Sequence, residues 1–138
     1  MKVIFLDVDG VLNSVADKWS TELSTESHLL LLKQLVDTTG AKIVLSSSWR
    51  KIPSLLSVLE AKLQSLGLSI YSSTRSVPGT RGIEIKDWLT HSGEDIEQFV
   101  ILDDDSDMDE YTNTNLVHTR ASIGFQKEDL DKAKEILQ

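Results

Sequence analysis

An aspartate pair near the N-terminus is the first place in this chain where side-chain chemistry can be expected. Asp7 and Asp9 follow the apolar run Val3–Leu6, and Gly10 comes directly after them. Residues two apart on an extended chain share a face, so the two carboxylates point the same way. Two anions that close repel each other by about 4 kcal/mol at a surface-like dielectric. A bound cation or a shared proton would offset this repulsion, whereas a plain turn at Asp9-Gly10 is the alternative without chemistry.

A second apolar run, Val100–Leu102, also ends in aspartates, which are Asp103, Asp104 and Asp105. If both runs are strands of one parallel sheet, their carboxyl ends lie at the same edge, where open α/β sheets bind ligands. Three or four carboxylate and carbonyl oxygens, completed by water, suit Mg²⁺. The candidate metal ligands are Asp7, Asp9, Asp103 and Asp104.

The acidic run 103–110 allows two other interpretations. A calcium-binding loop that starts at Asp103 would need glycine where Met108 stands and glutamate where Thr114 stands, so the sequence disfavours it. A solvated acidic loop does not account for Asp103, because this residue directly ends an apolar strand. It does account for the remaining acids, Asp105, Asp107, Asp109 and Glu110.

Hydroxyl side chains end a third apolar run, since Ile43–Leu45 leads into Ser46, Ser47 and Ser48. Hydroxyls at a strand end, together with N–H groups at the start of the next helix, can bind a phosphate oxyanion. Serines are also common as helix caps and in loops, so an ordinary structural role is the alternative.

A phosphate that faces carboxylates also needs a positive charge, which holds it and stabilises charge in the transition state. Arg81 and Lys86 lie at the start and inside of a short predicted helix that leads into the second acidic strand. Arg50 and Arg75 are further candidates. Each of the four could instead be a plain surface cation.

Composition narrows the classes of function. Fourteen basic and 22 acidic residues give a net charge of −8, which disfavours a broad nucleic-acid-binding surface but not a single phosphate site. The chain has no cysteine, so disulfides and thiolate metal sites are excluded. The histidines are isolated and show no metal-ligand spacing; they are His28, His91 and His118.

The length of 138 residues suits one domain, which we expect to cover positions 1–138. The first apolar run is broken by Asp7 and does not resemble a signal peptide. No stretch approaches the length of a membrane span. We therefore expect a cytoplasmic protein without a membrane partner.

Short β-rich runs alternate with helical runs along the chain. Strands are predicted over Lys2–Asp7, Lys42–Ser46, Leu68–Ser72, Phe99–Leu102 and Asn115–His118. Helices are predicted from the caps Ser24 and Thr25 to Gly40, from Pro53 to Gly67, over Ile83–Thr90 and over Gln126–Leu137. This alternation indicates an α/β fold, a Rossmann-like three-layer sandwich around a mostly parallel five-stranded sheet. Only the stretch 13–23 leaves room for an insertion after the first strand, so no large cap domain is expected.

The motifs together resemble those of the haloacid-dehalogenase-like (HAD) superfamily of phosphohydrolases. "DVDGVLN" from Asp7 resembles its first motif, "VLSSSW" its second and "ILDDD" its fourth, in matching order over nearly the whole chain. "VLSSSWR", "RGIEIKDWL" and "ILDDDSD" are similar to a cap-poor HAD group. Members of that group occur as domains of RNA-repair proteins and resemble the phosphatase half of polynucleotide kinase-phosphatases.

The resemblance implies a role for each motif residue. Asp7 would attack phosphorus and form an aspartyl-phosphate, and Asp9 would act as general acid and base. Mg²⁺ would be bound by Asp7, the Asp9 carbonyl and Asp103, with Asp104 as a ligand or a neighbour of one. Phosphate would be contacted by Ser47, with Ser46 and Ser48 as alternatives, and by Arg81, with Lys86 in reserve.

The resemblance also implies a phosphatase with an open site and a large substrate, such as a polynucleotide end, a nucleotide or a phosphoprotein. The net negative charge speaks against nucleic acid. Two other functions remain open at this point: a catalytically weak metal-binding regulatory module and a phosphoacceptor domain with a stable phospho-aspartate.

Overall fold

The computed structural model describes residues 1–13 and 26–138. The predicted caps Ser24 and Thr25, and most of the stretch 13–23, lie outside the described residues. The strands are β1 (Lys2–Leu6), β2 (Lys42–Leu45), β3 (Ile70–Ser73), β4 (Gln98–Asp103) and β5 (Leu116–His118). The α-helices are α1 (Glu26–Thr39), α2 (Pro53–Ser65), α3 (Arg81–His91) and α4 (Lys127–Ile136), and two 3-10 turns are η2 (Ser48–Lys51) and η3 (Asp109–Tyr111).

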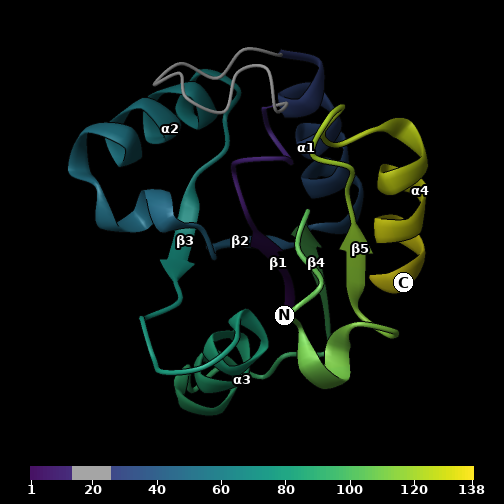
Figure 1. The fold of residues 1–138 in the computed structure, drawn as a ribbon. Coiled ribbons are helices and arrows are strands. Elements are labelled where there is room, and N and C mark those ends of the chain that lie inside the picture. The colour runs from purple at the N-terminus through teal and green to yellow at the C-terminus, as the bar shows by residue number, and fades with distance from the viewer. Residues whose placement is uncertain (14–25) are drawn as a thin grey trace.

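The five strands form one sheet in the order β3-β2-β1-β4-β5, and every pair is parallel (Figure 1). The predicted α/β fold is therefore confirmed, with a sheet that is wholly rather than mostly parallel. From β1 the chain first builds outward through β2 and β3, and then returns to the other side of β1 for β4 and β5. The order thus reverses between β1 and β4, and the carboxyl ends at such a switch point are where α/β sheets bind ligands.

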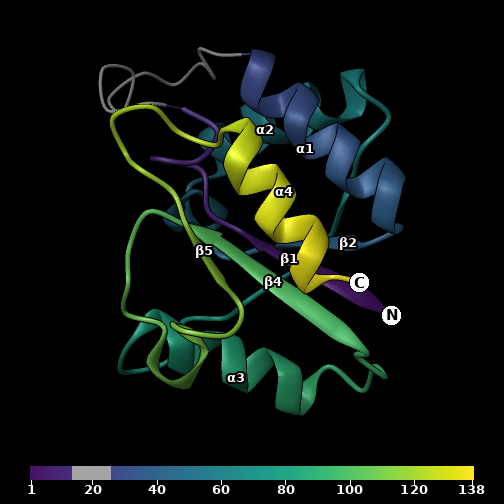
Figure 2. The ribbon, with the colours of Figure 1, turned by 90° about the vertical axis from the view of Figure 1, so that its right-hand side faces the viewer.

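Helices cover both faces of the sheet, in the three layers that the sequence predicted (Figure 2). Helices α1, α2 and α4 lie over one face and α3 lies over the other. Side chains of β1 alternate between the two cores: Ile4 and Leu6 belong to the larger one, while Val3 and Phe5 pack with Ile85 and other residues beneath α3. Every second residue of a strand therefore faces α3, and the residues between them face the larger core.

Local signals explain where two elements differ from their predicted bounds. Helix α2 ends in a Schellman motif, in which Gly67 N–H donates to the Gln64 carbonyl and Leu68 N–H to the Leu63 carbonyl. This motif holds Leu68 in the turn, so β3 begins at Ile70 instead.

Helix α3 begins at Arg81, two residues before the predicted start, because the Thr80 side chain accepts from Ile83 N–H as its N-cap.

Residues 1–13 and 26–138 form a small fold without a large cap domain. Over residues 1–13 and 26–138, no helix combines the length and apolar character needed to cross a membrane.

Candidate active site

The ends of β1 and β4 bring Asp7 and Asp103 together at the switch point. Asp7 N–H donates to the Leu102 carbonyl at 3.0 Å, so the sheet pairing continues through this residue. Asp7 is two residues after Phe5, and Asp103 is two residues after Ile101. Because Phe5 and Ile101 both face α3, the two carboxylates face it as well.

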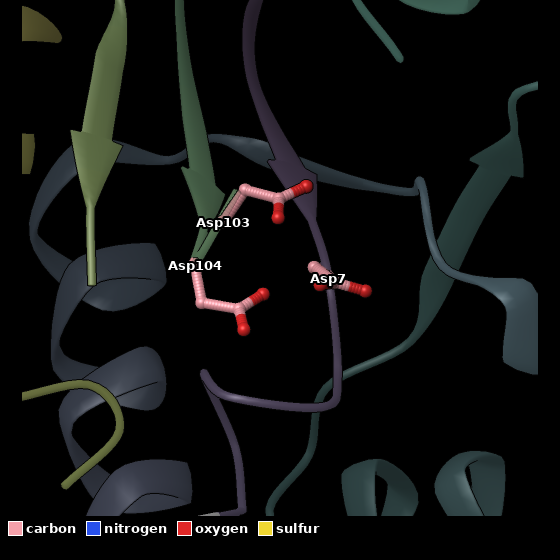
Figure 3. Close-up of side chains that lie close together, drawn as sticks. All are labelled: Asp7, Asp103 and Asp104. Atoms are coloured by element: carbon pink, nitrogen blue, oxygen red, sulfur yellow. The ribbon is translucent and has the colours of Figure 1, made fainter. Parts of the chain in front are cut away.

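Asp104 completes a group of three carboxylates. One oxygen from each of Asp7, Asp103 and Asp104 lies within 4.8 Å of the others, and Figure 3 shows the three side chains side by side at the strand ends. Gly10 makes this close approach possible: its φ is +79°, and a Cβ on it would lie 2.5 Å from the Asp104 carboxyl carbon. The glycine of the "DVDG" motif is therefore required by both the backbone and the acidic cluster.

The carboxylates are buried with little compensating charge. Asp7 is 8% exposed and Asp103 is 1% exposed. Burial, and then the negative charge of Asp103, raises the pKa of Asp7 well above its usual value. Burial also raises the pKa of Asp103 to about 6, although the nearby Arg81 opposes this shift. A divalent cation among the three oxygens would remove this cost, and the all-oxygen donor set fits Mg²⁺.

Arg81 lies across from the carboxylates as the first residue of α3. Its Nη1 is 3.8 Å from Asp7 Oδ1 and 3.6 Å from Asp103 Oδ2, which are ion-pair distances without a hydrogen bond. Lys86, the other predicted cation, points away from the site and pairs with Glu110 at 3.5 Å. The structure therefore brings Arg81, and not Lys86, to the acidic cluster.

Glu84 contacts Arg81, and Arg50 in turn binds Glu84. Glu84 Oε1 is 3.8 Å from Arg81 Nε, and its Oε2 accepts from Arg50 Nη2 at 3.1 Å. The Arg50 side chain is 6% exposed and also donates to the carbonyls of Ser47 and Thr74, at 2.7 and 2.8 Å. Arg50 thus links the end of β2, the β3–α3 connection and α3 in one buried network, whose charged hydrogen bonds are of the stronger kind.

The loop after β4 fixes the start of α3 from the other side. Gly82 N–H donates to the Asp107 carbonyl at 3.0 Å, and Arg81 N–H donates to the Asp107 carboxylate at 3.2 Å. A Cβ on Gly82 would lie 2.6 Å from the Met108 carbonyl carbon, so only glycine allows this contact. Met108 itself is fully buried beneath α3. The acidic run is therefore a packed loop, and its exposed acids include Asp105 and Asp109.

Asp9 lies in the turn after β1 and meets the segment after β2. Its Oδ2 accepts a hydrogen bond from the indole Nε1 of Trp49 at 3.2 Å. Its Oδ1 is buried and has no hydrogen-bond partner within residues 1–13 and 26–138. Asp9 is not part of the three-carboxylate cluster, which leaves its carboxyl group available for other chemistry.

The three serines after β2 lie in different environments. Ser47 Oγ accepts from Trp49 N–H at 3.1 Å and so caps the turn η2, and Ser48 is exposed. Ser46 is 1% exposed, and its Oγ has no partner among the described residues. Two residues after Val44, which packs beneath α3, Ser46 faces the same side as Asp7.

Unpartnered buried polar atoms concentrate at this edge of the sheet. Among the described residues, four of them belong to the site: Asp9 Oδ1, Ser46 Oγ, Arg81 Nη1 and Asp103 Oδ2. Buried polar groups in native proteins are nearly always paired, so such atoms need a partner. Carboxylate oxygens suit a cation, while a hydroxyl and a guanidinium N–H suit the oxygens of an anion such as phosphate.

The sequence pattern did not reveal the parts of Trp49 and Glu84 in this arrangement, and it indicated Arg50 only as a candidate cation facing phosphate, whereas the structure pairs it with Glu84. Their partners are 40, 3 and 34 residues away along the chain, and the two long separations involve contacts that no local motif encodes. A usable signal existed only for Glu84, three residues after Arg81 on a helix, which places the two on one face. The histidines keep to structural contacts; buried His28, for example, is bonded through Nδ1 to the Phe125 carbonyl at 2.8 Å.

Comparison with known families adds independent information. The family described as "HAD domain in Swiss Army Knife RNA repair proteins" matches residues 3–130 of the 138. The chain belongs to this family. Searches of curated proteins and of solved structures each gave no match. The match covers β2 to β5, all of β1 except Lys2, the acidic cluster and Arg81, and it confirms the resemblance inferred from the motifs.

Proposed function

We propose that this HAD domain is a Mg²⁺-dependent phosphomonoesterase that works through an aspartyl-phosphate on Asp7. The observation that carries the proposal is the meeting of three carboxylates and one arginine at the switch point, with Arg81 Nη1 3.8 Å from Asp7 Oδ1. Phosphohydrolase chemistry is typical of HAD domains and agrees with this arrangement. A cation and a phosphoryl group would together neutralise the buried acids and the guanidinium.

The metal would be held by Asp7, Asp103 and the carbonyl of Asp9, with Asp104 bound directly or through water. When bound, Mg²⁺ would neutralise charge on the phosphoryl oxygens and on the carboxylates. The donor set supports this proposal because Asp103 Oδ2 is buried and has no hydrogen bond among the described residues.

The protein's own groups would carry the bond changes. Asp7 attacks phosphorus, the ester P–O bond breaks, and the leaving oxygen takes a proton from the Asp9 carboxyl. Asp9, now a carboxylate, then takes a proton from water as the water oxygen attacks phosphorus and the bond to Asp7 breaks. Arg81 would neutralise the phosphoryl oxygens, and Ser46 replaces Ser47 as the proposed hydroxyl donor to them, because its Oγ is buried and unpaired in the described part of the chain.

The family name points to a substrate related to RNA repair, so a phosphorylated nucleic-acid end or a nucleotide is the proposed substrate class. The net charge of −8 means that binding would depend on the local cations and the metal and not on a broad basic surface. Two alternatives use the same residues: a regulatory module that binds the metal without turnover, and a phosphoacceptor domain.

Hydrolysis of an aryl phosphate by the purified protein with Mg²⁺ is the test. We expect turnover that EDTA abolishes and that Asp7→Asn lowers by about 10⁴-fold or more, as for other nucleophile deletions. The matched control is Asp37→Asn on the outer surface of α1, which should retain activity. Metal binding without turnover on any phosphoester would support the regulatory alternative. A phospho-Asp7 that persists far beyond the mixing time would support the phosphoacceptor alternative.

A further inference from the structure

Trp49 is built into the fold in a way that directs its indole N–H to Asp9. The side chain is 2% exposed and lies in η2, directly behind the serines that end β2. Its backbone N–H is bonded to Ser47 Oγ at 3.1 Å, and its carbonyl accepts from Ile52 N–H at 3.2 Å. The neighbouring Arg50 anchors the same turn through the Ser47 carbonyl at 2.7 Å. Hydrogen bonds to both the N–H and the carbonyl of Trp49 therefore fix the main chain that carries the indole.

The hydrogen bond distinguishes the two oxygens of Asp9. Indole Nε1–H can only donate, so the oxygen it contacts, Oδ2 at 3.2 Å, must accept. Oδ1 has no hydrogen-bond partner in the described part of the chain, although it is buried. An acid that protonates a leaving group needs one oxygen free for the proton and a fixed direction for it.

We infer that Trp49 is a positioning residue for Asp9, which fixes the carboxyl group so that Oδ1 carries the proton exchanged with the leaving group. The inference rests on the proposed function and goes beyond it in assigning a role to a residue that has none in the proposed bond changes. In this role the indole acts through Asp9 and not on the substrate directly. It acts by limiting the rotation of the Asp9 carboxyl group.

The consequence is a dependence on the leaving group. A p-nitrophenolate leaves without a proton, whereas an alkoxide needs the proton of Asp9 as the P–O bond breaks. Trp49→Phe keeps a buried aromatic ring but removes the N–H, so it should slow alkyl phosphates more than aryl phosphates. The quantity to compare is kcat/KM, because it covers only the steps up to formation of the aspartyl-phosphate.

The experiment measures kcat/KM for p-nitrophenyl phosphate and for glycerol 2-phosphate with Mg²⁺. We expect Trp49→Phe to raise the aryl-to-alkyl ratio by about tenfold, a part of the 10²–10⁴-fold that general acid catalysis supplies. Trp88→Phe is the matched control, since Trp88 is also buried but donates its indole N–H to Ser72 at 3.0 Å. It should leave the ratio unchanged. In an Asp9→Asn background the effect of Trp49→Phe on the ratio should vanish.

An unchanged aryl-to-alkyl ratio would overturn the inference. If kcat/KM fell equally for both substrates, Trp49 would have a merely structural role. A wild-type protein that hydrolyses neither substrate would instead contradict the proposed function. If Trp49→Phe does not fold, the indole ¹⁵N–H resonances of the otherwise intact protein give the answer. Asp9→Asn should then shift the Trp49 resonance and leave that of Trp88 in place, and an unmoved Trp49 resonance would overturn the inference.

Discussion

Two arginine–carboxylate groups that involve α3 differ in both spacing and electrostatics; one contains Arg81 at the start of the helix and the other contains Asp87 further along it. Arg75 forms two hydrogen bonds to Asp87, at 2.7 and 2.8 Å, and these bonds lower the pKa of Asp87. Arg81 stands 3.6 and 3.8 Å from two buried acids and bonds to neither, and burial raises the pKa of both. The first group is a satisfied surface ion pair.

The comparison shows what the candidate site lacks by itself. One arginine faces three clustered carboxylates, and the burial of Asp7 and Asp103 makes their charge costly. A structural ion pair would close to hydrogen-bond distance, as Arg75 does on Asp87. The open spacing around Arg81 is what a site needs if additional charged groups bind between the side chains.

Replacing the two arginines should produce the largest contrast. Arg81→Met removes the cation proposed to face the phosphoryl group, so we expect kcat/KM for an aryl phosphate to fall about 10²–10³-fold. Arg75→Met, at a side chain that is 67% exposed, should change it by less than about twofold. Steady-state kinetics with Mg²⁺ measures both. If both substitutions lowered kcat/KM equally, Arg81 would have no special role in the site compared with the surface residue Arg75.

The pH dependence of stability should differ in sign between the two groups when metal is absent. Because the folded-state pKa of Asp103 is raised from 3.8 to about 6, the folded state binds more protons than the unfolded state over this range. The free energy of unfolding therefore falls as pH rises from about 4 to about 6, by up to about 3 kcal/mol from this group. Asp7 adds a loss in the same direction.

Urea unfolding in EDTA across this pH range measures the effect, and Asp103→Asn should flatten the slope. Asp87 has a lowered pKa, so its contribution is present above its unfolded pKa and is lost only as the pH falls below about 4. If the free energy of unfolding rose between pH 4 and pH 6, and Asp103→Asn left this pH dependence unchanged, the raised pKa of Asp103 would be contradicted.

The smallest effect is expected from the exposed pair. Asp87→Asn removes a surface ion pair, whose worth is small and is screened by salt. Its midpoint of thermal unfolding should fall slightly at low salt and match that of the wild-type protein at high salt. A decrease as large as that of a core substitution would mean that the Arg75–Asp87 pair has a structural role that its exposure does not suggest.

The sequence predicted the strand ends well, because a buried apolar run that leads directly into aspartate is typical of the carboxyl end of a strand in a parallel sheet. It could not decide which serine after β2 faces the site, because that depends on which face of the sheet each side chain lies on. Ser46, and not the favoured Ser47, lies on the same face as Val44, which is the face covered by α3. The phase of a four-residue strand is uncertain until its pairing is known, and here Ser46 N–H pairs with the Leu6 carbonyl.

Contacts between distant segments account for what the sequence could not supply. Trp49 meets Asp9, and Arg50 meets Glu84, only because β2 lies beside β1 and α3 lies beneath both. Arg81 could be favoured over Lys86 from its place at a helix start. The packing that directs Lys86 toward Glu110 depends on the loop after β4, which no periodicity describes.

The contact between Gly82 and Met108 also determines where the chain can change in length. It fixes the loop 104–111 against α3, so an inserted residue there would move the acids and Arg81 at once. The turns at Gly40, Gly67 and Gly93 precede β2, β3 and β4 at the opposite edge of the sheet, and a Cβ at each would meet no described atom within 4 Å. Insertions, tags or fused domains placed at those turns would leave the chemistry untouched, since exposed turns accept added residues most readily.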